Sequence, residues 1–170
     1  MATTTVNYSS NTSISCSVAS LASSATFIAG QESNEVDNTT NKYMDAMVRG
    51  KVTVGTTPTA NTQINVYVWG ADTSLATTPI DVLDGTDSAE TLTNAGVLFS
   101  ALARLATLTV TATTSNVGYD FSTASVANAL GLPCLPKFWG LYVAHNTGVA
   151  LNSTAGNHFF EYVGVKFDTA

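Results

Sequence analysis

The amino-acid sequence predicts an all-β protein, an antiparallel β-sandwich with a jelly-roll-like topology, and three observations favour it. Several segments alternate apolar and polar residues with a period of two, as half-buried strands do. Ser and Thr are abundant, and β-branched Thr favours pleated strands over helices. Polar loops rich in Gly, Asn and Pro separate the segments, so that eight or so short strands are expected.

The first half of the chain contains the clearest strand, over 44–54. Apolar residues share one parity there, and Gly50 lies where a bulge is expected. A second strand follows over 64–69, with Val66 and Val68 directed inward and Tyr67 and Trp69 directed outward. The short linker between the two strands predicts either a hairpin or a close corner. A shorter strand is expected over 14–18, and a polar loop over 31–42.

The second half predicts at most one short helix, about 123–130, capped by Ser122 or Thr123 and ended by Gly131 and Pro133. Before it, 97–106 could be a helical turn, and 106–112 alternates as a strand. The strand over 138–144 is apolar on both faces, which predicts a central position with both sides covered. The last strand is expected over 158–167.

Two parts make up the predicted domain organisation, an extended N-terminal arm over 1–12 and a single β-sandwich domain over 13–170. The arm is polar and lacks periodicity, so we expect it to order on a partner. Its candidate interface residues are Thr3, Thr4, Thr5, Val6 and Tyr8.

Charge and composition exclude some partners. Six basic residues against twelve acidic ones give a net charge of −6, so a phosphate-binding footprint for nucleic acid is not expected. Charged residues are only 11% of the chain, against roughly 25% in average proteins. Such an uncharged polar surface costs little to desolvate and suits lateral packing in a large assembly. No export signal and no apolar span are recognisable, so we expect synthesis in a cytoplasm and no membrane partner.

Catalytic patterns are weak, and we expect neither an enzyme nor a cofactor. His145 and His158 are the only histidines, each at a turn boundary, and no G-x-S-x-G motif accompanies them. We expect both to be exposed turn or interface residues. The two cysteines, Cys16 and Cys134, are far apart in sequence and are expected to be buried thiols.

An acidic run over 81–90 is expected to be a solvated loop. A glycosidase-like carboxylate pair is possible there in principle, but no aromatic cleft pattern accompanies the run. Asp84, Asp87 and Glu90 are weak candidates for calcium ligands, since they do not follow EF-hand spacing.

The segment from Leu135 to Val165 contains an L-P-x-x-W-G-L strand, an N-x-T-G turn, an A-L pair and a Y-x-G-V strand. It resembles the capsid decoration (cement) proteins of tailed bacteriophages, which have a jelly-roll-like fold. The resemblance covers about the last 35 residues. It is carried by Leu135, Pro136, Trp139, Gly140, Leu141, Asn146, Thr147, Gly148, Ala150, Leu151, Tyr162, Gly164 and Val165.

The resemblance implies a homodimer or homotrimer on the outside of an icosahedral virion, made in the host cytoplasm and binding across neighbouring major capsid protein subunits. The arm would then extend over a neighbour. An alternative is a glycan- or receptor-binding module of a phage tail or fibre. In that case the outward Tyr67 and Trp69 would form a stacking platform, unless a loop covers them.

Overall fold

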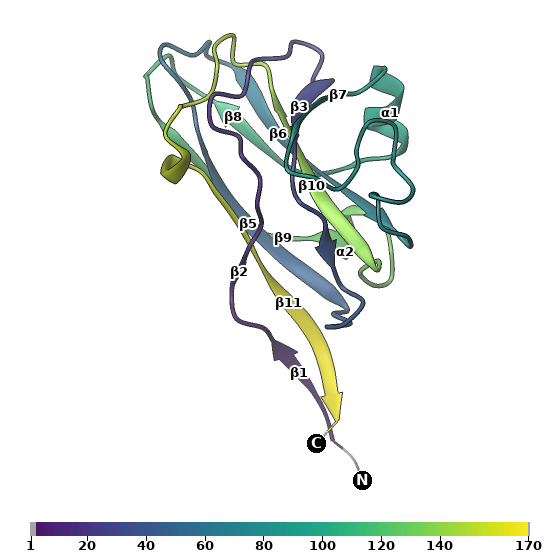
Figure 1. The fold of residues 1–170 in the computed structure, drawn as a ribbon. Helices are drawn as coiled ribbons and strands as arrows, with labels where there is room; N and C mark the ends of the chain where they lie inside the picture. Colours follow the sequence, from purple (N-terminus) through teal and green to yellow (C-terminus); the bar gives the residue numbers. More distant parts are fainter. Residues whose placement is uncertain (1–2, 170) are drawn as a thin grey trace.

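The computed structural model describes residues 3–169 and consists of two antiparallel sheets packed face to face (Figure 1). This confirms the predicted all-β sandwich. The first sheet runs in the order β1 (Thr4–Tyr8), β11 (Phe159–Thr169), β5 (Asp45–Thr53) and β9 (Gly118–Ser125), with β2 (Thr12–Ser13) also on β11. The second sheet runs in the order β7 (Ala89–Thr91), β3 (Ala29–Glu32), β10 (Phe138–His145), β6 (Thr62–Ala71) and β8 (Ala103–Val110), with β4 (Val36–Asp37) also on β10.

Strand β5 follows the predicted alternation. Ala46, Val48 and Val52 are fully buried between the sheets, whereas Arg49 is exposed. The register of β5 with β9 shifts between Val48 and Gly50, which confirms the expected bulge. A Cβ at Gly50 would lie 2.8 Å from the main-chain oxygen of Phe159, so only glycine fits there.

The connection from β5 to β6 is a corner between the sheets. Strand β5 pairs with β11 and β9, whereas β6 pairs with β10 and β8. The hairpin alternative is therefore wrong and the close corner is correct. Thr57 and Asn61 adopt positive φ angles of 53° and 60° in the linker, where the chain turns from one sheet to the other.

Strand β10 lies inside the second sheet, between β6 and the β3 and β4 strands, as its two apolar faces predict. Trp139, Leu141 and Val143 join the core between the sheets. Tyr142 and Ala144 point to the opposite face and join a second apolar cluster. Both faces of β10 are thus covered.

Four local expectations are wrong. Residues 14–18 form no strand, and the expected 31–42 loop contains the end of β3 and all of β4. The predicted helix over 123–130 is only α2 (Val126–Ala129), since 123–125 extend β9 along β5 and Ser125 caps the helix. A second helix, α1 (Ala95–Ser100), begins after Asn94, so the expected maximum of one helix is exceeded. A 3-10 turn, η1 (Ala155–Asn157), precedes β11.

The described part of the N-terminal arm is paired with the domain. Strand β1 bonds to β11 from Thr4↔Thr169 to Tyr8↔Val165, and together they form a two-stranded ribbon that extends beyond the body of the sandwich (Figure 1). Met1 and Ala2, which belong to the expected arm, lie outside the described residues. Within residues 3–169, no helix has the length and apolarity needed to cross a lipid bilayer.

Candidate functional site

The outer face of the first sheet carries an apolar stripe along β11. Phe160 and Tyr162 point into the core, so Phe159, Val163 and Phe167, on the other parity, point away from the second sheet. Phe159 is 41% and Phe167 58% exposed, which is unusual for phenylalanine. No segment of the described chain covers these two rings.

Neighbouring strands widen the stripe. Val6 pairs directly with Phe167, and Tyr8 with Val165, so these four side chains share one face of the ribbon. Val6 is 50% and Tyr8 68% exposed. Met47 of β5 lies opposite Val163 on the same outer face. We call the set Val6, Tyr8, Met47, Phe159, Val163, Val165 and Phe167 the β11 stripe.

The opposite face of the ribbon is polar. The Asn7 amide donates to Asp168 Oδ2 at 2.7 Å, and Lys166 Nζ lies 3.3 Å from the same oxygen. These contacts with Asn7 and Lys166 lower the pKa of Asp168. The ribbon is therefore amphipathic, and its apolar side continues the outer face of the first sheet. A two-stranded ribbon of this kind is marginally stable alone in water.

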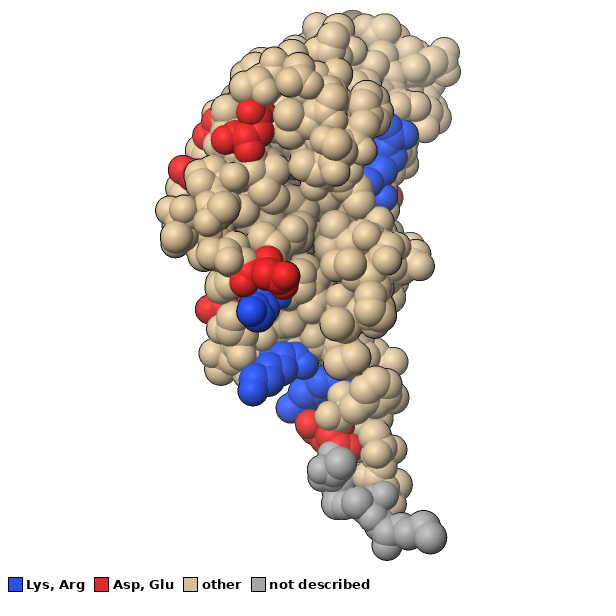
Figure 2. Space-filling view, turned by 90° about the vertical axis from the view of Figure 1, so that its right-hand side faces the viewer, with Lys and Arg blue, Asp and Glu red and all other residues tan. Residues whose placement is uncertain are grey.

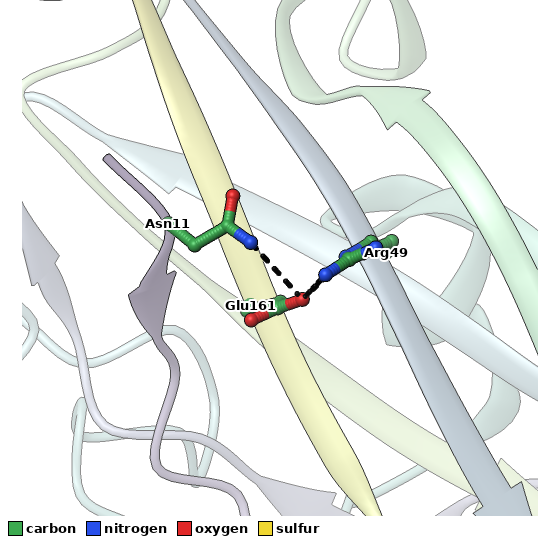
Figure 3. A network of polar contacts seen from close by, with 3 residues as sticks. All are labelled: Asn11, Arg49 and Glu161. Carbon is green, nitrogen blue, oxygen red and sulfur yellow. Dashed lines mark hydrogen bonds and ion pairs between the residues drawn. The ribbon is translucent and has the colours of Figure 1, made fainter. Parts of the chain in front are cut away.

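One ion pair interrupts the stripe. Glu161 of β11 pairs with Arg49 of β5, directly opposite it, and Asn11 donates to Glu161 Oε1 at 3.5 Å (Figure 3). The Arg49 side chain is 54% exposed, so this pair contributes little to stability. The Asn11 contact links the chain just before β2 to β11.

The outer face of the second sheet is, by contrast, covered by the chain itself. Tyr67, Trp69 and Tyr142 lie on this face, beneath a segment over 72–102 that includes α1 (Figure 1). Five leucines of the segment are buried against it: Leu75, Leu83, Leu92, Leu98 and Leu102. Tyr67 is 2% and Trp69 0% exposed. The predicted direction of both side chains, away from the core between the sheets, is correct. Neither can serve as an interface or stacking residue, because the 72–102 segment covers both, as the alternative prediction of a covering loop has it.

Carboxylates fasten the covering segment to β3 and the chain around it. Glu32 is fully buried and accepts the backbone N–H groups of Asp84 and Gly85, both at 3.0 Å. Burial, opposed by these two bonds, raises the pKa of Glu32 to about 7. Glu35 accepts the N–H of Leu75 at 2.8 Å. The sequence did not single out Glu32 or Glu35, since both lie in what reads as a polar loop.

The three candidate calcium ligands, Asp84, Asp87 and Glu90, do not converge on one point. Asp87 accepts from Ser17 N, Ser17 Oγ and Gln31 Nε2, each at 2.7 Å, whereas Glu90 accepts from Ser88 Oγ. Asp84 caps its own turn through Thr86 N. Within residues 3–169, no three His, Cys, Asp or Glu side chains lie close enough to hold a metal ion. Asp84, Asp87 and Glu90 are therefore not brought together as one set of ligands.

Both histidines link strands to loops. His145 is completely buried, with Nδ1 at 2.9 Å from Thr147 Oγ1 and Nε2 at 3.0 Å from Leu21 O. His158 is half-buried and accepts the N–H of Thr53 through Nδ1. Burial lowers the pKa of both imidazoles. The expectation of exposed histidines is thus wrong, because each ring satisfies backbone groups at a strand end.

The cysteines differ in environment. Cys16 is half-buried and packs against the core, and burial raises the pKa of its thiol. Cys134 is exposed and lies in the 131–137 connection between α2 and β10. The expectation of two buried thiols is wrong for Cys134.

Residues of the phage-like motif serve the fold. Trp139 is buried and contacts Tyr162 edge-to-face, with ring centroids 5.2 Å apart. Gly140 lies under the Trp69 indole. Asn146 accepts the N–H of Gln63 at 2.7 Å.

The remaining motif residues shape turns and close contacts. Thr147 binds His145, and Gly148 turns with a φ of +79°. Pro136 packs over Gly70, and Gly164 leaves room for the Tyr43 ring.

No protein-family model, curated protein or solved structure matches this chain significantly.

Proposed function

We propose that this chain is a structural protein that decorates and stabilises an icosahedral phage capsid by binding across neighbouring major capsid subunits. The observation that supports it most is the uncovered β11 stripe. The second sheet buries its outer face under the chain's own 72–102 segment, whereas the first sheet leaves Val6, Tyr8, Phe159 and Phe167 open. Exposed apolar surface bordered by polar groups is typical of protein interfaces.

The mechanism follows from the ribbon. Its apolar side extends the contact surface past the body, so one copy can reach two adjacent subunits. The low charge density of the chain reduces the cost of desolvating the polar residues around the stripe. Many such contacts repeated by symmetry hold neighbouring subunits together through effective concentration, even where each contact is weak.

The expected homodimer or homotrimer stays a prediction, and sedimentation velocity of the purified protein tests it. The glycan-binding alternative relied on Tyr67 and Trp69, and their burial removes its platform. No other described surface feature favours that alternative.

Co-sedimentation with capsid shells tests the proposal. The shells are assembled from the major capsid protein encoded in the same genome. The variants are Tyr8→Ser and Phe167→Ser, which remove exposed apolar surface without opening the core. Each is expected to weaken binding about tenfold, since burying one large apolar side chain is worth roughly 1.5–3 kcal/mol.

The matched control is Asn7→Ser, on the polar face of the same ribbon. It is expected to bind shells nearly as the wild type does. Wild-type binding by both apolar variants, or an equal loss in the control, would contradict the stripe as the docking surface.

A further inference from the structure

A pocket of about 330 Å³ lies between the turn over 38–44 and the segment over 134–137. Hydrogen bonds fix its two walls against each other. Asn38 N donates to Lys137 O and Leu135 N to Met44 O, both at 2.8 Å. The Asn38 side chain holds the turn closed, accepting from Tyr43 N at 2.8 Å and donating to Tyr43 O at 3.0 Å. The chain's own hydrogen bonds therefore hold the pocket in shape without a ligand.

Its lining combines apolar and basic side chains. Tyr43, Met44 and Leu135 are apolar lining residues of the pocket, and Met44 is 40% exposed. Lys42 and Lys137 line the same pocket with exposed side chains. Within the described chain, neither lysine forms an ion pair with a carboxylate. The pocket thus presents two unpaired ammonium groups beside an apolar surface, which suits a ligand with both a negative charge and an apolar group.

The pocket adjoins the root of the ribbon. Met44 N donates to Val165 O at 2.7 Å, where β11 leaves β5, and the Tyr43 ring packs on Gly164. Figure 2 shows basic side chains at this lower end of the body, just above the ribbon, with acidic side chains beside them. The lining of the pocket contains two lysines and no carboxylate, although the whole chain carries a net charge of −6.

We propose that this pocket receives a peptide segment of the partner protein in which a carboxylate lies next to an apolar side chain. The apolar side chain packs on Tyr43, Met44 and Leu135, and the carboxylate lies between Lys42 and Lys137. The identity of the partner rests on the proposed function; the chemistry of the pocket does not. Two lysines in an acidic chain favour an acidic peptide over a nucleic acid, which requires many phosphate contacts.

The energetics predict weak and salt-sensitive binding at each pocket. Exposed ion pairs contribute roughly 0.2–1 kcal/mol each and are screened as the Debye length shortens with salt. Binding at one site is therefore modest, and it becomes effective when many copies sit on a repetitive surface.

The exposed thiol of Cys134 lines the pocket and provides a native reporter. The probe is the capped peptide acetyl-Gly-Asp-Leu-Asp-Gly-amide, compared with its neutral analogue in which Asn replaces Asp. The full-length protein is titrated with each peptide while alkylation of Cys134 by iodoacetamide is followed by mass spectrometry. The acidic peptide is expected to slow alkylation at least fivefold at saturation, and the neutral one to require about tenfold more peptide.

Lys137→Glu is expected to weaken binding of the acidic peptide about tenfold, as calorimetry or the alkylation assay will measure. Lys51→Glu is the matched control with the same change of charge, on β5 outside the pocket, and should bind as the wild type does. Equal binding of both peptides, equal loss in both variants, or unprotected Cys134 would overturn the proposal. Equal protection of Cys134 by inorganic phosphate would also overturn it, because the apolar contact would then be irrelevant.

Failure of the pocket is distinguishable from failure of the proposed function. Shell binding that Phe167→Ser weakens about tenfold and Lys137→Glu leaves unchanged would refute the pocket and retain the decoration role. Shells that do not bind the wild-type chain would refute the decoration role, whereas the peptide titration would still decide whether the pocket takes a carboxylate.

Discussion

Replacing Glu32 by Gln should change how the stability of the protein depends on pH. Glu32 is fully buried under the 72–102 segment, and its pKa is raised from 4.5 to about 7. Between these values the folded protein binds more protons at this site than the unfolded chain does. The contribution of Glu32 to the free energy of unfolding is thus fully present below about pH 4.5, and it is lost as the pH rises to about 7.

The magnitude follows from the shift. One pKa unit corresponds to about 1.4 kcal/mol, so the Glu32 shift is worth about 3 kcal/mol over this range. Gln has nearly the same shape and does not titrate. Its amide nitrogen cannot accept one of the two N–H groups, but that loss is the same at every pH. The free energy of unfolding of the wild type, minus that of Glu32→Gln, should therefore fall by about 3 kcal/mol from pH 4.5 to pH 7.

Urea unfolding followed by tryptophan fluorescence measures this difference, because Trp69 and Trp139 are both buried in the folded state. His145 acts in the opposite direction. Burial lowers its pKa, so its contribution increases as the pH rises toward 6.5, and subtracting the variant from the wild type removes it. A difference that stays constant within about 0.5 kcal/mol, or that grows with pH, would refute the assignment of Glu32 as a buried, proton-binding support of the segment.

Two further predictions concern packing and thiol access. Gly140→Ala should lower the free energy of unfolding by about 1–3 kcal/mol, because a Cβ there would lie 2.7 Å from Trp69 Cε2. Gly156→Ala is the control, since a Cβ at Gly156 meets no atom within 4 Å. Thermal unfolding compares the two variants, and equal destabilisation would contradict the close approach of Gly140 to Trp69. In the native protein, iodoacetamide should modify the exposed Cys134 and spare Cys16, because burial raises the pKa of the Cys16 thiol. Peptide mass mapping identifies the modified cysteine. Modification of Cys16 at a rate similar to that of Cys134 would contradict the burial of Cys16.

The strands were predictable where periodicity was strong. The β5 alternation, the Gly50 bulge and the two apolar faces of β10 all follow from side-chain period and size. Parity also predicted that Tyr67 and Trp69 leave the inter-sheet core. What parity cannot predict is whether a distant segment covers them. Residues 72–102 have little regular structure, so their five buried leucines carry no periodic signal.

The candidate surface was predictable only in part. Val6 and Tyr8 were singled out as interface residues of a free arm, and both are exposed. Their pairing with Val165 and Phe167 was not foreseen, because long-range strand pairing between chain ends leaves no local trace. Glu32 was missed for a related reason: its partners, the N–H groups of Asp84 and Gly85, lie some fifty residues away.

If this chain decorates a repetitive shell, as we propose, each virion carries it in many copies. Quantitative mass spectrometry of purified virions, produced by the genome that encodes the chain, tests it most directly by counting copies per particle. We expect hundreds of copies, in a fixed ratio to the major capsid protein. A handful of copies per particle would indicate a tail or vertex protein, and absence from the virion would contradict the account altogether.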